Sequence, residues 1–211
     1  MTRLSRRPHR CPTRLRPPGT VALVLALITA FAACRRPPDP VGSYAATNQA
    51  DCLPDVMLLD QNGRNLSLAS LRGRPVLIDF VYTTCHGPCP MLTSKLALIA
   101  ERLGPQLGSK VTLVSITLDP EHDHPAELSE YARSHGADKS GWLFLTGSPT
   151  QIEQVLAAYK LHRQREADGS VTHMVSAFLL GPDGRQVRIY NAIEVTPETV
   201  TADIERLLRQ G

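Results

Sequence analysis

The sequence predicts a single α/β domain built on a central mixed sheet. Two short apolar runs, 76–82 and 111–118, are rich in β-branched residues and have the pattern of strands buried on both faces. Each run is followed by apolar residues at helical spacing. The composition, 42% hydrophobic and 20% charged in 211 residues, is that of an ordinary globular domain with a sizeable core.

A β-hairpin is predicted ahead of the first buried strand. Val56 opens its first strand, Asn62-Gly63 is a strong signal for a tight turn, and 66–68 is the return strand. Strands and helices then alternate along the chain. The predicted strands are 76–82, 111–118, 142–145, 174–180 and 185–190. Four helices are predicted from their buried stripes. The stripes are Leu92, Leu96, Ile99 and Leu103; Leu128, Tyr131 and Ala132; Ile152, Val155, Leu156 and Tyr159; and Val200, Ile204, Leu207 and Leu208.

The order of these elements indicates the fold. Ser148-Pro149-Thr150-Gln151 is a capping box that begins one helix, and 160–172 is either a hairpin or an exposed excursion. The chain runs strand, helix, strand, helix, and then two antiparallel strands and a last helix. This is the order of a thioredoxin-like sandwich. The N-terminal β-hairpin and an inserted strand and helix at about 142–160 are additions to it. We expect this domain to occupy 53–211.

The N-terminus is predicted to be a targeting segment. Residues 1–33 contain six arginines, no acidic residue, and an apolar run that is shorter than the ~20 residues of a membrane span. Small residues directly before Cys34 resemble a bacterial lipobox, so we expect a signal peptide over 1–33 and a lipid on Cys34; an uncleaved anchor or ordinary cleavage nearby is the alternative. Residues 34–52 are predicted to be a flexible tether. The domain is therefore expected outside the cytoplasm.

The charge distribution argues against a nucleic-acid partner. The formal net charge is +3, but without residues 1–33 the chain has 17 Lys and Arg against 20 Asp and Glu, a balance of −3. A mildly acidic domain lacks the basic surface that binds a phosphate backbone. We therefore expect no nucleic acid among its partners.

Two cysteines, Cys85 and Cys89, lie between the first buried strand and the helix that follows it. Pro90 suits the first helical position, which would make Cys89 the N-cap. Unpaired amides and the helix dipole favour thiolates there. Such a pair can form a reversible disulfide or bind a soft cation such as Cu(I), whereas a purely structural disulfide would close too small a loop to stabilise much. The role of Cys52 stays open.

A copper site made of two thiolates is incomplete, and His173 is the predicted third ligand. His173 comes directly before the predicted strand 174–180. In a thioredoxin-like fold, the segment that enters this strand faces the cysteines and usually contains a proline, but none occurs between Pro149 and Pro182. Met174 is a candidate soft ligand, although a core methionine is the simpler interpretation.

The other histidines give weaker signals. His86 lies between the cysteines and is interpreted as an exposed loop residue, with tuning of the thiolates as the alternative. His122 and His124 alternate with acidic residues and can form an auxiliary metal site, but a polar loop capped by Asp123 is favoured. Asp119 and Asp123 follow a buried strand, where a partner contact is a further option.

Three segments together resemble the SCO/SenC family: Tyr82–Pro90, Ile116–Asp123, and His173 ahead of Gly181–Gly184. The resemblance extends over essentially all of 53–211. It implies a thioredoxin-like domain that binds one copper ion per chain. The implied function is a copper chaperone that delivers copper to the dinuclear copper centre of cytochrome c oxidase, or keeps the thiols of that centre reduced.

Carried over to this chain, the resemblance implies that Cys85, Cys89 and His173 are the copper ligands and that oxidation forms a Cys85–Cys89 disulfide. The implied partners are the apo copper subunit of cytochrome c oxidase and other periplasmic copper carriers or thiol reductants, met on the periplasmic side of a membrane to which the N-terminus is anchored. Many members have Pro-Asp-Val between the cysteines, whereas this chain has His86-Gly87-Pro88, which leaves the redox potential and the choice of target open. The alternative is a thiol–disulfide oxidoreductase acting through Cys85 and Cys89.

Overall fold

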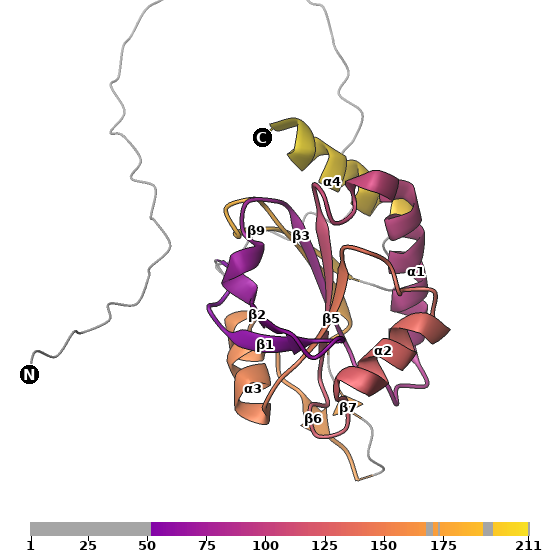
Figure 1. The fold of residues 1–211 in the computed structure, drawn as a ribbon, viewed down its shortest axis with the longest axis vertical. Helices are drawn as coiled ribbons and strands as arrows, with labels where there is room; N and C mark the ends of the chain where they lie inside the picture. The colour runs from indigo at the N-terminus through magenta and orange to yellow at the C-terminus, as the bar shows by residue number, and fades with distance from the viewer. Residues whose placement is uncertain (1–51, 168–170, 173, 192–195, 211) are drawn as a thin grey trace, which may run out of the picture. The chain divides into compact units, whose positions relative to one another are not determined.

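The structure, a computed structural model, describes residues 52–167, 171–172, 174–191 and 196–210. These residues form an α/β sandwich around a seven-stranded sheet (Figure 1). The predicted signal peptide over 1–33, the lipidation of Cys34 and all of the tether before Cys52 lie outside the described residues. Within them, none of the helices is both long enough and apolar enough to cross a membrane.

The sheet has the strand order β2-β1-β5-β4-β3-β8-β9. The strands are β1 (Met57–Asp60), β2 (Asn65–Ser67), β3 (Val76–Val81), β4 (Thr112–Thr117), β5 (Trp142–Thr146), β8 (Ser176–Leu180) and β9 (Gln186–Asn191). The central strands β3, β4 and β5 are parallel, and the outer strands pair antiparallel, so the sheet is mixed as predicted. A separate ribbon pairs β6 (Gln164–Arg165) with β7 (Val171–Thr172).

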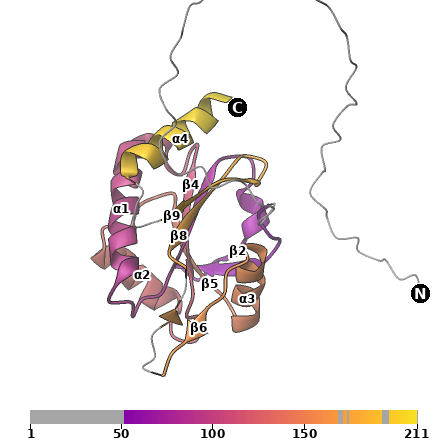
Figure 2. The same cartoon turned by 180° about the vertical axis from the view of Figure 1, so that it is seen from behind.

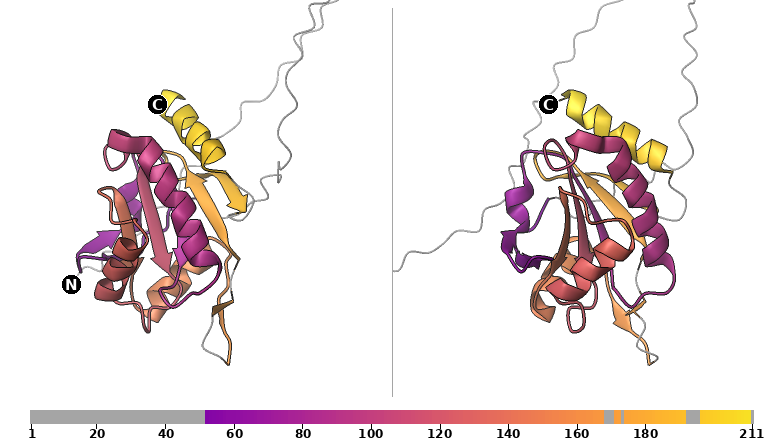
Figure 3. Two further views of the ribbon diagram at one scale, coloured as in Figure 1. Left: turned by 90° about the vertical axis from the view of Figure 1, so that its right-hand side faces the viewer. Right: turned by 45° about the vertical axis from the view of Figure 1, so that its right-hand side comes forward.

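Helices cover both faces of the sheet. They are α1 (Pro88–Leu103), α2 (Pro125–Ser134), α3 (Pro149–Ala158) and α4 (Pro197–Gln210), with short 3-10 turns η1 (Leu68–Leu71) and η2 (Gly104–Gln106). Helices α1, α2 and α4 lie on one face and α3 on the other (Figures 1 and 2), and α4 packs across α1 (Figure 3). Because both faces are covered, every residue of β3 and β4 is buried.

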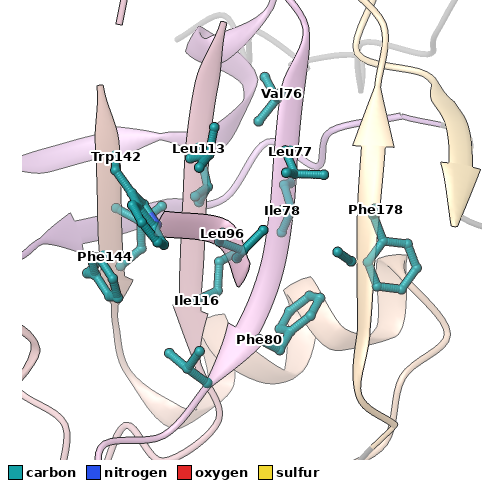
Figure 4. Packing of buried hydrophobic residues seen from close by; sticks show 14 of the residues in the cluster. Val76, Leu77, Ile78, Phe80, Leu96, Leu113, Ile116, Trp142, Phe144 and Phe178 are labelled. Atoms are coloured by element: carbon teal, nitrogen blue, oxygen red, sulfur yellow. The ribbon is translucent and has the colours of Figure 1, made fainter. Parts of the chain in front are cut away.

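The two faces of β3 pack against different helices. Phe80 points toward α3, where its ring meets Tyr159 and Phe178 edge-on at centroid distances of 5.7 and 5.9 Å (Figure 4). Leu77 packs on the opposite face against α1. Since side chains alternate along a strand, Asp79 shares the α1 face with Leu77. This alternation places a buried carboxyl group beneath the helix that carries Cys89.

The structure confirms two local predictions, the β1–β2 turn and the start of α3. Gly63 has φ +73, a conformation that suits glycine, and its N–H donates to the Asp60 carbonyl at 2.9 Å to close the β1–β2 turn. At the start of α3, the Ser148 Oγ accepts the Gln151 N–H at 3.3 Å, and the Gln151 side chain accepts the Ser148 N–H at 2.7 Å. The capping box is therefore formed as predicted.

Two boundaries differ from the predictions. Helix α1 begins at Pro88 with Gly87 as its N-cap, so Cys89 is not the N-cap but lies inside the first turn. Either proline suits a first turn, and Gly87 supplies the unusual backbone conformation (φ −123, ψ −109) that starts the helix earlier. Within 160–172, β6 and β7 pair as a hairpin, which was one of the two predicted alternatives; residues 168–170 between them lie outside the described residues. The strand expected from Met174 begins at Ser176.

Candidate metal centre

Cys85 and Cys89 meet where the loop after β3 enters α1. The Cys85 N–H donates to the Tyr82 carbonyl at 3.1 Å, which turns the chain back toward the helix. Cys89 is the second residue of α1. Their exposed fractions are 6% and 0%, and neither cysteine is in a disulfide. The fold therefore presents two thiols at a helix start, shielded from bulk water.

The sulfur of Cys85 accepts several hydrogen bonds. Burial opposes its ionisation, but hydrogen bonds from the Cys89 thiol, from the Cys89 and Gly87 N–H groups and from the Tyr82 hydroxyl outweigh the cost of burial and lower the pKa of Cys85. Backbone N–H groups at a helix start stabilise a thiolate in this way. Cys85 is therefore the sulfur that loses its proton first.

Cys89 behaves in the opposite way. Its deeper burial raises its pKa, and the hydrogen bond that it donates to Cys85, together with the negative charges of Cys85 and Asp79, raises it further. The effect expected of the helix start therefore acts on Cys85, whereas at Cys89 burial and neighbouring negative charge raise the pKa. The physical reason is that two adjacent anions and a nearby carboxylate cannot all be charged in a buried site.

Asp79 is a functional candidate that the sequence analysis missed. Its carboxyl is 1% exposed and accepts a hydrogen bond from the Ser115 hydroxyl at 2.6 Å, while its Oδ2 has no hydrogen-bond partner. The Trp142 indole N–H donates to the same Ser115 hydroxyl at 3.0 Å. Burial raises the pKa of Asp79 to about 7. An acidic residue inside an otherwise apolar strand run was the only signal for it in the sequence.

Asp123 anchors the cysteine loop. Its carboxylate accepts the Thr83 N–H at 3.1 Å and the hydroxyls of Thr83 and Thr117 at 2.5 Å each. Burial raises the pKa of Asp123 in spite of these hydrogen bonds. The N-cap of α2 is His124, so the predicted helix-capping role of Asp123 is wrong. Its actual role is to join the loop two residues before Cys85 to the end of β4.

The polar loop after β4 forms a network of its own. The His122 Nδ1 lies 2.9 Å from a carboxylate oxygen of the buried Asp119, and Arg165 forms an ion pair with the same oxygen. Arg163, directly before β6, forms an ion pair with Glu121 at 3.1 Å. No group of three His, Cys, Asp or Glu side chains in the described part of the chain is arranged to hold a metal, so the auxiliary site considered for His122 and His124 is not formed there.

The structure describes some of the remaining candidate residues and not others. His173 lies outside the described residues, whereas its neighbour Met174 is 65% exposed, so the core interpretation of that methionine is wrong. His86 is exposed, as favoured from the sequence. Cys52 is partly buried, and its role stays open.

The direction of β8 shows at which end of the sheet the chain enters that strand. β8 runs antiparallel to β3, with Asp79 opposite Ala177. The start of β8 is therefore at the end of the sheet where β3 leads into the cysteine loop. Val171, in β7, also reaches this end, because its N–H hydrogen-bonds the Tyr82 hydroxyl.

A thioredoxin-like sandwich with two buried cysteines at the start of α1 defines a thiol-bearing, soft-metal or redox domain. The chain belongs to the SCO1/SenC family, whose sequence profile matches residues 45–209. The SCO1 protein homolog of Bacillus subtilis is 34% identical over 150 residues, which cover 69% of this chain and 77% of that protein.

Solved structures agree with this assignment. Bradyrhizobium japonicum ScoI with copper bound has a TM-score of 0.66 at 31% identity, over 74% of this chain and 99% of that one. BsSco, a member of the Sco family of cytochrome c oxidase assembly proteins in which a disulfide switch was identified, has a TM-score of 0.66 at 30% identity, over 76% and 95%. A SCO1/SenC family lipoprotein of Bacillus anthracis has a TM-score of 0.69 at 26% identity, over 75% and 95%.

Proposed function

We infer that this chain binds copper and acts as a copper chaperone in the assembly of cytochrome c oxidase. The observation that carries the inference is the buried pair of thiols, Cys85 and Cys89, at the start of α1, in a member of a family that includes a copper-bound relative. Thiolates are the ligands that select Cu(I). The lowered pKa of Cys85 makes it the first of the two to form a thiolate, and Cys89 loses its proton when the metal binds.

We further propose that Cys85, Cys89 and His173 are the three ligands of one copper ion. The two sulfur atoms already hydrogen-bond each other, so both can reach one small cation. Support for His173 comes from its neighbours, since β7 ends at Thr172 and β8 starts at Ser176 at the end of the sheet that holds the cysteine loop. An imidazole completes a site that two thiolates leave short of ligands.

Copper is cargo in this proposal, so the site must release it as well as bind it. A site near the end of the sheet, with Cys85 in a loop, leaves the bound ion within reach of a partner protein. We propose the apo copper subunit of cytochrome c oxidase as the recipient, with periplasmic copper carriers or thiol reductants as further partners. The domain is proposed to be held on the periplasmic side of the membrane through a lipid on Cys34 after removal of residues 1–33. The lipoprotein relative supports this location.

Copper titration of the reduced chain tests the proposal. Wild-type protein should bind one equivalent of Cu(I), and His173→Ala should bind it more weakly and change the spectrum of the copper form. The matched control is His162→Ala, which removes an exposed imidazole. An unchanged affinity and spectrum in His173→Ala would show that the third ligand is not His173, and the absence of copper binding by wild-type protein would reject the chaperone function.

A second candidate function, a thiol–disulfide oxidoreductase, is favoured by the opposite pKa shifts of the two cysteines. The Cys85 thiolate would attack a target disulfide and release one target thiol. Cys89 would then displace the second target thiol, leaving the target reduced by two electrons and a Cys85–Cys89 disulfide. In this case Cys85→Ser and Cys89→Ser should abolish reduction of a protein disulfide while His173→Ala spares it. If Cys85→Ser, Cys89→Ser and His173→Ala all lost the reduction of a protein disulfide equally, the copper function alone would be favoured.

A further inference from the structure

The β6–β7 ribbon is fastened to the rest of the domain by two arginines, Arg163 and Arg165. Arg163 donates from Nη1 to the Leu118 carbonyl at 2.7 Å and to a carboxylate oxygen of Glu121 at 3.1 Å. Its Nε donates to the carboxylate of Glu153, in α3, at 2.8 Å. The Arg163 side chain is 15% exposed, so these charge-assisted hydrogen bonds are largely shielded from water and hold the ribbon against its neighbours.

Arg165 fastens the next part of the ribbon. It lies in β6, forms an ion pair with the carboxylate of Asp119 and stands opposite Val171 of β7. The Asp119 side chain is 2% exposed, and a carboxylate buried this deeply is costly unless a positive charge accompanies it. Arg165 supplies that charge permanently, whereas the ring of His122 beside the same oxygen is charged only when it is protonated.

The loop 118–123, which accepts both arginines, also holds the cysteine loop. The carboxylate of its last residue accepts the Thr83 N–H at 3.1 Å, two residues before Cys85. The ribbon that the arginines fasten ends at Thr172, directly before His173. One short loop therefore connects the two parts of the chain that supply the proposed copper ligands.

We propose that Arg163 and Arg165 are positioning residues of the copper site, which hold the β6–β7 ribbon against the loop 118–123 and so place the chain that leads into His173 beside the cysteine loop. This inference rests on the copper function proposed above. Residues that orient a metal ligand without touching the metal commonly contribute tenfold or more to metal affinity. The physical reason is that a ligand held in place before binding loses less conformational freedom when the metal binds.

The double variant Arg163→Gln, Arg165→Gln in the full chain tests the proposal, because glutamine removes the charge and most of the hydrogen-bond donors. Competition with a colorimetric Cu(I) chelator should show an affinity about tenfold lower than that of wild-type protein. The matched control is Arg102→Gln, which removes an ion pair with Glu198 near the end of α1 that is remote from Cys89. The control should bind Cu(I) with wild-type affinity.

The same double variant combined with His173→Ala shows whether the arginines act through the ribbon. In that background the ligand that they position is gone, so the arginine substitutions should cost no further Cu(I) affinity. A general loosening of the fold would instead lower the affinity by the same factor in both backgrounds. If circular dichroism shows that the double variant is unfolded, Arg163→Gln alone, which leaves the Arg165–Asp119 pair in place, is compared in the two backgrounds and should show a smaller loss with the same dependence on His173.

The outcomes separate this inference from the chaperone function. If wild-type protein binds copper and the arginine variants bind it equally well, the positioning role is rejected while the chaperone function stands. An equal loss with and without the His173 imidazole also rejects it, because the arginines then act on the fold as a whole. Failure of wild-type protein to bind copper rejects the chaperone function, and the positioning role falls with it.

Discussion

The thiol of Cys89 donates a hydrogen bond to the sulfur of Cys85, and this contact shifts the pKa values of the two groups in opposite directions. A hydrogen bond from a thiol stabilises an anion at the acceptor and disfavours one at the donor. In the metal-free protein the first negative charge of the pair therefore falls on Cys85. This arrangement suits both capture of a soft cation and attack on a disulfide.

The first prediction concerns the order in which the cysteines react. Iodoacetamide added to the reduced, metal-free protein at neutral pH should label Cys85 before Cys89, because only the thiolate reacts. Since the pKa of Cys85 is lowered from its ordinary 9.0, its labelling rate should level off below pH 9 as the pH is raised. Peptide mass spectrometry at several times and pH values measures both rates.

Cys89→Ala provides the matched variant for this measurement. It removes the thiol donor to Cys85, so Cys85 should be labelled more slowly at neutral pH and level off at higher pH. Equal labelling rates for the two cysteines in wild-type protein would contradict the charge assignment.

The second prediction concerns Asp79 and the pH dependence of stability. Its pKa is raised from 3.8 to about 7 in the folded state, so the folded protein keeps a proton that the unfolded chain loses between these pH values. The free energy of unfolding should therefore fall as the pH rises from 4 to 7, by on the order of 4 kcal/mol if the other groups are held equal. Asp79→Asn, which resembles the protonated form, should lack this part of the dependence.

Urea unfolding of wild-type protein and Asp79→Asn at pH 4, 5.5, 7 and 8 checks this. The difference in unfolding free energy between the two proteins should change in favour of Asp79→Asn as the pH rises. Parallel pH profiles would show that Asp79 titrates alike in the folded and unfolded chains.

The third prediction concerns Asp123 as the anchor of the cysteine loop. Asp123→Ala leaves the hydroxyls of Thr83 and Thr117 without their acceptor, and should lower the free energy of unfolding by about 2–3 kcal/mol. Thr83→Val removes only the Thr83 hydroxyl and should cost about 1 kcal/mol. Chemical denaturation measures both. Asp138→Ala, an exposed carboxylate, is the control and should stay within about 0.5 kcal/mol of wild type.

Loss of the Asp123 anchor should also affect copper binding. Because Thr83 lies two residues before Cys85, a freed loop should weaken Cu(I) binding in Asp123→Ala under conditions where the variant is still folded. A destabilised variant with wild-type copper affinity would show that the loop is held by α1 alone.

Local signals in the sequence were enough for the fold and for the two cysteines. The buried strand run over 76–82, the turn at Asn62-Gly63 and the capping box at Ser148 each depend on neighbouring residues, and each is present in the structure. The spacing of Cys85 and Cys89 ahead of a helix is likewise a local feature. These patterns carry information because backbone conformation and side-chain periodicity are decided over a few residues.

The charge state of the site was decided only by the tertiary structure. That Cys85 rather than Cys89 carries the charge depends on depth of burial and on Asp79, which β3 places beneath α1. Asp123 joins Thr83 to Thr117, because the register of the sheet places the end of β3 beside the end of β4. The sequence by itself determined which groups are present and that the two cysteines lie close to a helix start. Which of them share a proton or a hydrogen bond was decided by long-range packing, because burial and hydrogen bonding act between residues that no local pattern connects.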